Sequence, residues 1–311
     1  MDYEGNVLSY YRTGGCYFPE TGLEQAMRYI EIASENAMKN ANITEDDIEA
    51  VVAGITGIDW PGDDCMVADA LRKTLGVEDV QAHNDCVIAL FSGTQKNFGA
   101  ALCAGTGINA VIICPDGKQF VMSDYLDSDL QGGSALAYRA LRKVFDADLG
   151  LVPPTKLTQL FLEFAGANEP YDLLKESIVN RDDLLKRITA LVPQIVSLAD
   201  EGDKVTAELL DEMSRGLCDY FIAGLRKMNM LNVECDLVLA GSVFKGIHNR
   251  LTEEILRRLS ESAPKARLVN AKYEPVVGAC VMGFLQRNSF SQQVSERLEA
   301  SSRKLGLLRV V

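Results

Sequence analysis

The sequence predicts an α/β protein with two similar halves, and three observations lead to this prediction. Short apolar runs, typical of buried strands, alternate along the chain with stretches of helical periodicity. Two of these runs, 50–55 and 236–240, end near glycines and are each followed by a helix, a short strand and a further helix. The chain has 311 residues, a length that corresponds to two domains at roughly 100–200 residues for each domain.

In the first half, residues 7–12 are expected to be extended, and the capping-box pattern from Thr21 to Glu24 is expected to begin a helix that continues to about Lys39. The continuous apolar run Ala50–Ile55 predicts a buried strand. The elements that follow are expected to be a helix, a strand and a helix, at about 64–75, 80–84 and 86–91.

In the second half, two apolar runs joined by a Gly-Thr-Gly turn, and a third run after a Pro-Asp-Gly turn, predict three strands, at 100–104, 108–114 and 119–122. Helices follow, among them an apolar stripe over 184–195, which Pro193 should bend, and a long helix over 205–225. The last elements are expected to be a strand, a helix, a strand and two helices, at 236–240, 244–255, 267–269, 276–286 and 290–305.

The second half begins with a pair of strands that has no counterpart in the first half. By this parallel, residues 7–12 correspond to the strand 119–122, so the first half is predicted to lack its opening two-stranded hairpin. A hairpin of that kind has roughly 15–20 residues. The expected cause is a start assigned too far downstream or a shortened chain.

The composition excludes several classes of protein. The chain contains 31 Lys and Arg against 44 Asp and Glu, a net charge of −13, so no basic face is expected to bind nucleic acid. No apolar run approaches the roughly 18 residues of a membrane span, and residues 1–6 lack the features of a secretory signal. The eight cysteines include no C-x-x-C pair and there are two histidines, so we expect no metal centre but buried thiols in a reducing, cytoplasmic compartment.

The strongest local signal is the segment 103–109, Cys-Ala-Gly-Thr-Gly-Ile-Asn. Residues 105–110 fit the G-x-G-x-x-A pattern of dinucleotide-binding dehydrogenases, but that pattern requires a helix next, and the β-branched residues that follow predict a strand. The glycines are therefore expected at the tip of a hairpin, where backbone N–H groups can approach a phosphate and Thr106 can add a hydroxyl. A plain glycine turn explains the same residues, and the turn alone favours that interpretation.

Two other strand ends offer polar groups. Asp85 follows the strand 80–84 and begins a helix, so its carboxylate can face a cleft and act as a general base, although a helix N-cap explains it without any chemistry. Gly241 and Ser242 follow the strand 236–240, at a turn where a nucleotide can approach the backbone. A simple strand–helix turn capped by Ser242 is the alternative.

Five segments occur in an order and spacing that cover the chain from about Asp2 to Gln286; they are Ala53-Gly-Ile-Thr-Gly57, Asn84-Asp85, Gly105-Thr-Gly-Ile-Asn109, Gly241-Ser-Val-Phe-Lys245 and Pro275-Val-Val-Gly-Ala279. Together they resemble the BadF/BadG/BcrA/BcrD-type ATPase family, which includes N-acetylglucosamine kinases. This family belongs to the actin-like ATPase and sugar kinase superfold, a two-domain, ribonuclease H-like α/β fold.

The resemblance implies an ATP-dependent, Mg²⁺-requiring kinase that phosphorylates a sugar or amino sugar and forms a homodimer. The domains would be 1–97, with a C-terminal helix over 289–311 packing back on it, and 98–288. Asp85 would take the proton from the substrate hydroxyl, and no residue is assigned to a metal. The implied phosphate-binding residues are Gly105, Thr106 and Gly107, the adenosine-binding residues are Gly241 and Ser242, and the substrate-binding residues are Asn84, Asn109, Asp129 and Gln131.

The sequence departs from the family pattern in three places. The family begins with a strand–Asp-Gly-Gly-Gly-Thr–strand hairpin that holds phosphate, and its absence here implies impaired catalysis. Tyr17 stands where amino-sugar kinases have an Asn that touches the sugar. The Trp-Gly-His and Gly-Asp-Glu-Gly-Ser stretches of those kinases are replaced by 125–129 and 131–134.

Two other functions remain open on the sequence alone. One is an ATPase activator of a 2-hydroxyacyl-CoA dehydratase or benzoyl-CoA reductase type system. Such activators bind an iron–sulfur cluster through cysteines, and the position of Cys103, just before Ala-Gly-Thr-Gly, is similar to that pattern. No second suitable cysteine follows, however. The other is a non-catalytic nucleotide or sugar sensor.

Overall fold

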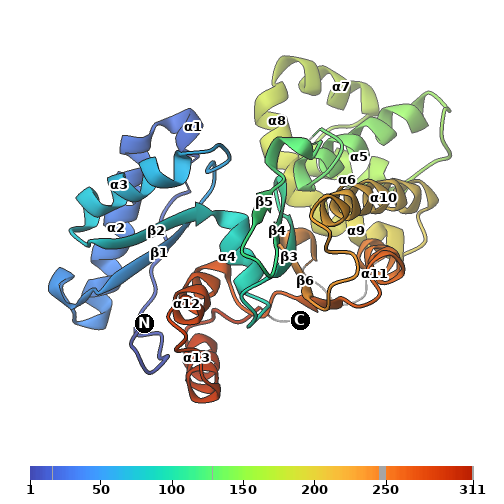
Figure 1. Cartoon of the computed structure of the whole chain (residues 1–311). Coiled ribbons are helices and arrows are strands. Elements are labelled where there is room, and N and C mark those ends of the chain that lie inside the picture. The colour runs from blue at the N-terminus through green and yellow to red at the C-terminus, as the bar shows by residue number, and fades with distance from the viewer. Residues whose placement is uncertain (16, 128, 245–249, 310–311) are drawn as a thin grey trace.

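The chain forms two lobes of unequal size (Figure 1). The computed structural model describes residues 1–15, 17–127, 129–244 and 250–309. The smaller lobe contains a two-stranded sheet, and the larger lobe contains a five-stranded sheet. Three helices lie between and below the two sheets: α4 (Asp85–Phe91), α12 (Pro275–Gln286) and α13 (Gln292–Lys304).

In the smaller lobe, β1 (Ala50–Ile55) and β2 (Asp79–Asn84) run parallel, with Ile55 paired with Asn84 at their carboxyl ends. Apolar residues of α1 (Phe18–Thr21), α2 (Leu23–Ala41) and α3 (Asp63–Leu75) pack on one face of this sheet, with Val67 and Leu71 fully buried. Among the described strands, β1 pairs only with β2, so its other edge has no strand neighbour.

In the larger lobe the strand order is β5-β4-β3-β6-β7. The strands β3, β6 and β7 are parallel, and β4 is antiparallel to both β3 and β5. A central strand buried on both faces is expected to be mainly apolar, and β6 is buried at every position and apolar at all but Asp236. The bounds are Gly99–Ala104 for β3, Ile108–Ile113 for β4, Gln119–Val121 for β5, Asp236–Ala240 for β6 and Arg267–Asn270 for β7.

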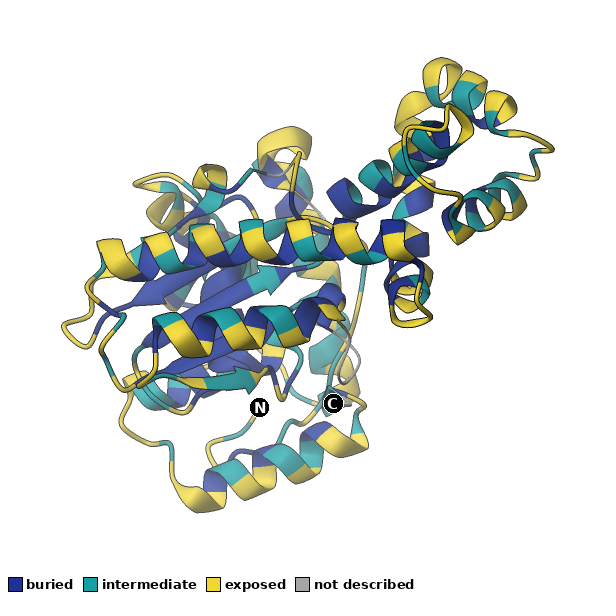
Figure 2. Cartoon of the chain, turned by 90° about the vertical axis from the view of Figure 1, so that its right-hand side faces the viewer, coloured by how far each residue is buried: buried dark blue, intermediate teal, exposed yellow. Residues whose placement is uncertain are grey.

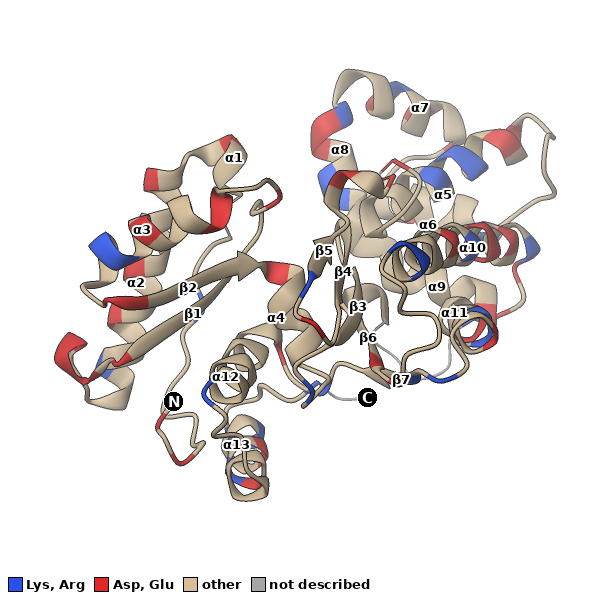
Figure 3. Ribbon diagram, in the orientation of Figure 1, with Lys and Arg blue, Asp and Glu red and all other residues tan. Residues whose placement is uncertain are grey.

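Seven helices of the described chain pack around the larger sheet and above it. Apolar and charged residues alternate along them with helical periodicity, and Figure 2 shows the resulting bands of buried and exposed residues. Figure 3 shows acidic and basic residues interspersed over the same helices. These helices are α5 (Gly133–Asp148), α6 (Lys156–Ala165), α7 (Pro170–Val179), α8 (Arg181–Ile188), α9 (Val192–Asp200), α10 (Lys204–Lys227) and α11 (Arg250–Ser262).

Most of the predicted elements are confirmed within a few residues, and four expectations were wrong. Residues 7–12 form no strand; the Val7 N–H donates instead to Ser301 Oγ of α13 at 2.9 Å. Thr21 does not cap α2, because it ends the short helix α1 and Gly22, at φ +87°, takes the N-cap position. Pro193 lies at the start of α9, so it separates two helices and does not bend one.

The fourth error concerns Phe244, which was expected in a helix but belongs to a short 3₁₀ turn, Ser242–Phe244. Two residues of the sequence prediction lie outside the described residues. They are Ile247, within the helix expected over 244–255, and Lys245, the last residue of the fourth family segment.

The helices α4 and α12 pack backbone against backbone, and this contact requires glycine at 278. A Cβ atom added there would lie 2.1 Å from the Ile88 carbonyl oxygen, which belongs to a helix and cannot move aside. We expect Gly278→Ala to lower the free energy of unfolding by about 3 kcal/mol, measured by urea denaturation. In Gly283→Ala, on the same helix, the new Cβ makes its closest contact at 3.4 Å from a Val52 methyl group, so a change within about 1 kcal/mol is expected. Equal losses in both variants would contradict this account.

A buried carboxylate ties the strand β6 to its surroundings. Asp236 is 1% exposed and accepts hydrogen bonds from Thr94 Oγ1 at 2.6 Å and Arg267 Nε at 2.9 Å. Burial alone would raise the pKa of Asp236, but the hydrogen bonds from Arg267 and Thr94 outweigh it and hold that pKa below its usual value.

The lowered pKa of Asp236 fixes the sign of a pH dependence. Its stabilisation is fully present above the unfolded pKa of about 3.9 and is lost as pH falls through the folded pKa. Asp236→Asn should therefore cost about 2 kcal/mol at neutral pH and less near pH 3, measured by urea unfolding at both pH values. The exposed control Asp46→Asn should differ from the unaltered protein by less than about 0.5 kcal/mol at either pH.

Candidate functional site

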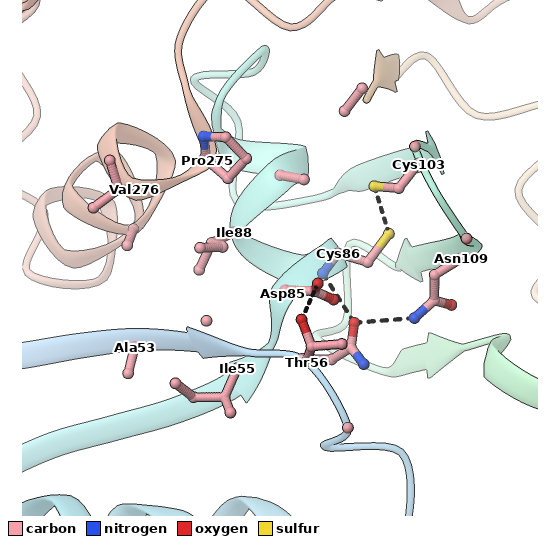
Figure 4. Close-up of a pocket in the computed structure, with 18 of the residues that line it drawn as sticks. Ala53, Ile55, Thr56, Asp85, Cys86, Ile88, Cys103, Asn109, Pro275 and Val276 are labelled. Carbon is pink, nitrogen blue, oxygen red and sulfur yellow. Dashed lines mark hydrogen bonds between the residues drawn. The ribbon is translucent and has the colours of Figure 1, made fainter. Parts of the chain in front are cut away.

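A cleft of about 840 Å³ lies where the two sheets meet. It is lined by residues that follow the carboxyl ends of four strands, β1, β2, β3 and β6. This is the edge at which parallel α/β sheets bind their ligands. Figure 4 shows part of it, with Asp85 and Cys86 at the start of α4 facing residues of β3 and β4. The lining residues used below are Thr56, Asp59, Asn84, Asp85, Cys86, Cys103, Gly105, Thr106, Gly107, Asn109, Ser123, Asp124 and Gly241.

Asp85 is the first residue of α4 and directly follows β2. Its Oδ2 accepts a hydrogen bond of 2.6 Å from Thr56 Oγ1, which comes from the end of β1 (Figure 4). Burial raises the pKa of Asp85, and the hydrogen bonds from Thr56 and from the Cys86 N–H offset part of that rise. A half-buried carboxylate with a raised pKa, held in place by a neighbour on a cleft wall, has the properties of a proton acceptor.

Asn84 connects the two lobes beneath the cleft. Its side-chain amide donates to the Ile58 carbonyl at 3.1 Å and to Asp59 Oδ1 at 2.9 Å. Its Oδ1 accepts from the Cys86 N–H at 2.9 Å and from Asn109 Nδ2 at 3.1 Å. Both N–H groups and both lone pairs of this buried side chain are thereby occupied. Asn84 therefore holds its neighbours in position. The Asn109 side chain has one N–H without an acceptor among the described residues, so Asn109 is better placed than Asn84 to contact a ligand.

The turn 105–107 leaves its N–H groups open to the cleft. The Gly105 N–H bonds across the turn to the Gly107 carbonyl at 2.9 Å, whereas the N–H groups of Thr106 and Gly107 have no acceptor among the described residues. Thr106 and Gly107 are exposed. A Cβ atom added at Gly107 would meet nothing within 4 Å. Two adjacent, unpaired backbone donors at a glycine turn are able to bind an anion.

The start of α5 holds this turn in position. The N–H of Gly133 donates to the Gly105 carbonyl at 2.8 Å, and the N–H of Ser134 donates to the Thr106 carbonyl at 3.0 Å. A Cβ atom at Gly133 would lie 2.6 Å from that Gly105 oxygen, so this position needs glycine. Because α5 already donates hydrogen bonds to these two carbonyl groups, the N–H groups of Thr106 and Gly107 are the backbone groups that remain available to a ligand.

Gly241 lies against the strand β3. Its φ is +112°, and a Cβ atom there would lie 2.0 Å from the Ala104 carbonyl oxygen, so only glycine lets the chain turn at this point. Gly241 lines the cleft. Ser242 is exposed and is not among the lining residues, but its Oγ lies 3.8 Å from where a Gly105 Cβ would be.

Two of the sequence-predicted substrate residues lie away from the cleft. Asp129 is exposed and is not among the lining residues. Gln131 is buried, and its amide lies 2.0 Å from where a Cβ atom of Gly216 in α10 would be. The structure therefore brings Asp85, Asn84, Asn109, Gly241 and the turn 105–107 to one cleft. Ser242, Asp129 and Gln131 are not among the residues that line it.

Sequence reasoning missed Thr56, Asp59 and Ser123. Asp59 Oδ1 accepts the hydrogen bond from Asn84 and another, at 2.5 Å, from Ser123 Oγ. Thr56 lies in the segment Ala53–Gly57 that had been recognised as a motif, so its place after a strand was a usable signal. Ser123 has no sequence signal, because its approach to Asp59 depends on how the two lobes meet.

Each lobe contains parallel strands, and the carboxyl ends of these strands meet at one shared cleft. The larger sheet is continued by an antiparallel hairpin. This arrangement defines the actin-like ATPase class of α/β fold. Among the described residues, no helix is both long and apolar enough to cross a bilayer. The chain belongs to the BadF/BadG/BcrA/BcrD ATPase family, whose model matches residues 1–283. The predicted fold and family are confirmed.

Known relatives and a solved structure agree with this assignment. The chain is 25% identical over 281 residues to the N-acetyl-D-glucosamine kinase of Dictyostelium discoideum, covering 88% of this chain and 87% of that one. It is 24% identical over 240 residues, 76% of this chain and 78% of the relative, to an N-acetylmuramic acid/N-acetylglucosamine kinase of Clostridium acetobutylicum. A crystal structure from Chromobacterium violaceum, provisionally named an N-acetylglucosamine kinase, matches 86% of this chain and 88% of its own with a TM-score of 0.62 at 17% identity.

Proposed function

We propose that this protein is an ATP-dependent kinase that phosphorylates a hydroxyl group of a sugar or amino sugar of the N-acetylglucosamine class. The observation on which the proposal rests is that one cleft contains both a half-buried carboxylate, Asp85, and the unpaired N–H groups of Thr106 and Gly107. Family membership and the two kinase relatives support the same activity.

The residues have distinct proposed roles. The N–H groups of Thr106 and Gly107 bind the terminal phosphates of ATP, and Gly241 and Ser242 lie beside the adenosine. Asp85 accepts the proton of the sugar hydroxyl while its oxygen attacks the γ-phosphorus, and ADP departs with the electron pair of the broken bond. Phosphoryl transfer mainly requires positioning and charge stabilisation, so one oriented carboxylate and a phosphate turn supply most of what the chain must contribute.

The cleft also fits a magnesium ion that arrives with the nucleotide. Among the described residues no three His, Cys, Asp or Glu side chains form a cluster that could hold a metal by themselves. Asp59, Asp85 and Asp124 line the cleft, and Mg²⁺ typically takes one or two such carboxylates together with phosphate oxygens. Asp59 is the residue that would hold it. When bound, Mg²⁺ neutralises part of the phosphate charge.

The proposal keeps Asn109 as a substrate contact, with Asn84 holding it in position, and leaves out Asp129 and Gln131, which do not line the cleft. The proposed domains are 1–97 together with 289–311, and 98–288, acting in a homodimer. Turnover is proposed to be slow, because one phosphate-binding turn lines the described cleft.

Calorimetry and a coupled assay of ADP release, with Mg-ATP and a panel of sugars that includes N-acetylglucosamine, test the proposal. We expect Mg-ATP to bind and ADP release to depend on an amino sugar. Binding of both ligands without ADP release would favour a sensor instead. Iron in the purified protein, with ATP hydrolysis independent of sugar, would favour the ATPase activator. Light scattering checks the homodimer.

A further inference from the structure

Two cysteines meet on the wall of the cleft. Cys86 follows Asp85 in the first turn of α4, and Cys103 is the penultimate residue of β3, two positions before Gly105. Their Sγ atoms lie 2.9 Å apart, although the two residues are 17 positions apart in sequence. Figure 4 shows the two sulfur atoms pointing toward each other. Within the described part of the chain no other two cysteines make such a contact.

The two thiols differ in access. Cys86 is 1% exposed, whereas Cys103 is half-buried and also lines the cleft. Burial raises the pKa of the Cys86 thiol well above its usual value, so Cys86 is a poor first nucleophile. A reagent that enters the cleft therefore meets Cys103 first.

We propose that Cys86 and Cys103 are a modification site, a dithiol that closes reversibly into an intramolecular disulfide when a small disulfide such as oxidised glutathione enters the cleft. The two sulfur atoms need only a small further approach to reach the bond length of about 2.0 Å in a disulfide.

The chemistry balances as a thiol–disulfide exchange. The Cys103 thiolate attacks one sulfur of the small disulfide, an S–S bond forms to that sulfur, and the other half departs as a thiolate. Cys86 then loses its proton to that thiolate or to solvent, attacks the Cys103 sulfur, and expels the second half. The protein dithiol loses two electrons and two protons, and the small disulfide is reduced to two thiols.

The bond would change the active cleft as well as the redox state. It joins the residue beside Asp85 to the strand that leads into the turn 105–107. Displacements of about 1 Å at reacting groups can reduce rates by about a hundredfold. We therefore expect the oxidised protein to turn over at least about tenfold more slowly, an effect that rests on the proposed kinase function.

Thiol counting tests the modification without any assay of activity. The reduced full chain is equilibrated with glutathione buffers of increasing oxidation, quenched in acid, alkylated with iodoacetamide and mapped by mass spectrometry. We expect two thiols to be lost together, a linked peptide that contains Cys86 and Cys103, and full recovery after dithiothreitol. Independent loss of single thiols, or a lasting glutathione adduct on Cys103 with no linked peptide, would overturn the proposal.

Variants and a second probe sharpen the result. Cys86→Ser should stop at the glutathione adduct on Cys103, and the exposed control Cys65→Ser should leave the linked peptide unchanged. Phenylarsine oxide, which needs two thiols within reach, should bind the unaltered protein and not Cys86→Ser. Neither the linked peptide nor the binding of phenylarsine oxide requires ATP, so both results remain interpretable if the protein has no kinase activity. If the kinase is active and the linked protein keeps its full rate, the regulatory part of the proposal fails.

Discussion

The Asp85→Asn variant should transfer phosphate at least about 10³-fold more slowly than the unaltered protein, with nearly unchanged affinity for Mg-ATP. The amide keeps an oxygen to accept the hydrogen bond from Thr56 but cannot take a proton from the sugar hydroxyl. Removal of a positioned general base typically costs 10²–10⁴-fold in rate. The rate is measured as ADP release at saturating sugar, and the affinity by calorimetry.

Two further measurements separate the base role from a structural one. Since burial raises the pKa of Asp85, its ionised form is disfavoured in the folded state, so Asp85→Asn should not lower the melting temperature. The rate of the unaltered protein should fall as pH drops through that raised pKa, and the variant should lack this dependence. Asp124→Asn, which removes the same charge from the same cleft, should change the rate less than about tenfold. A variant at Asp85 with undiminished turnover would refute the assignment.

The double variant Thr106→Val, Gly107→Val should weaken Mg-ATP binding by about a hundredfold, measured by calorimetry. The variant loses the Thr106 hydroxyl, and a hydrogen bond from it to a charged group would contribute about 1.5–3 kcal/mol. The two valine side chains would also occupy the space proposed for the phosphates. No atom lies within 4 Å of a Cβ at Gly107, so its side chain would extend into open space and the fold should persist.

Thr106→Ser is the matched control for that turn. It keeps the hydroxyl and adds no bulk to the turn, so its ATP affinity should stay within about threefold of the unaltered protein. Circular dichroism checks that both variants fold. Unaltered affinity in the double variant would mean that the turn 105–107 has only a structural role.

The spacing of apolar residues within a segment predicted those strands and helices whose buried positions are evident from that segment alone. The strand Asp236–Ala240 was predicted with its observed bounds, because a run buried on both faces is mainly apolar, as the four residues after Asp236 are. The long helix α10 was predicted because its apolar stripe continues for many turns. The Thr21 cap failed because Phe18–Thr21 form a helix of their own, which local pattern did not reveal.

The candidate site was predictable where a functional group follows a strand in sequence. Asp85 and the turn 105–107 satisfy this condition, and both line the cleft. Gln131 came from the family resemblance alone, in a stretch where this sequence departs from the family, and it packs against α10 instead. The contacts of Ser123 with Asp59 and of Cys86 with Cys103 depend on how distant elements face each other, which periodicity does not encode.

The unpaired edge of β1 has a consequence for how the protein behaves at high concentration. The segment Ala50–Ile55 contains no lysine, proline or charged residue, and its backbone groups on that side pair with no strand in the described part of the chain. Such an edge is a template onto which a strand of another molecule can add, and natural proteins usually blunt it. Concentrated preparations should therefore tend to form aggregates in which strands of different molecules pair.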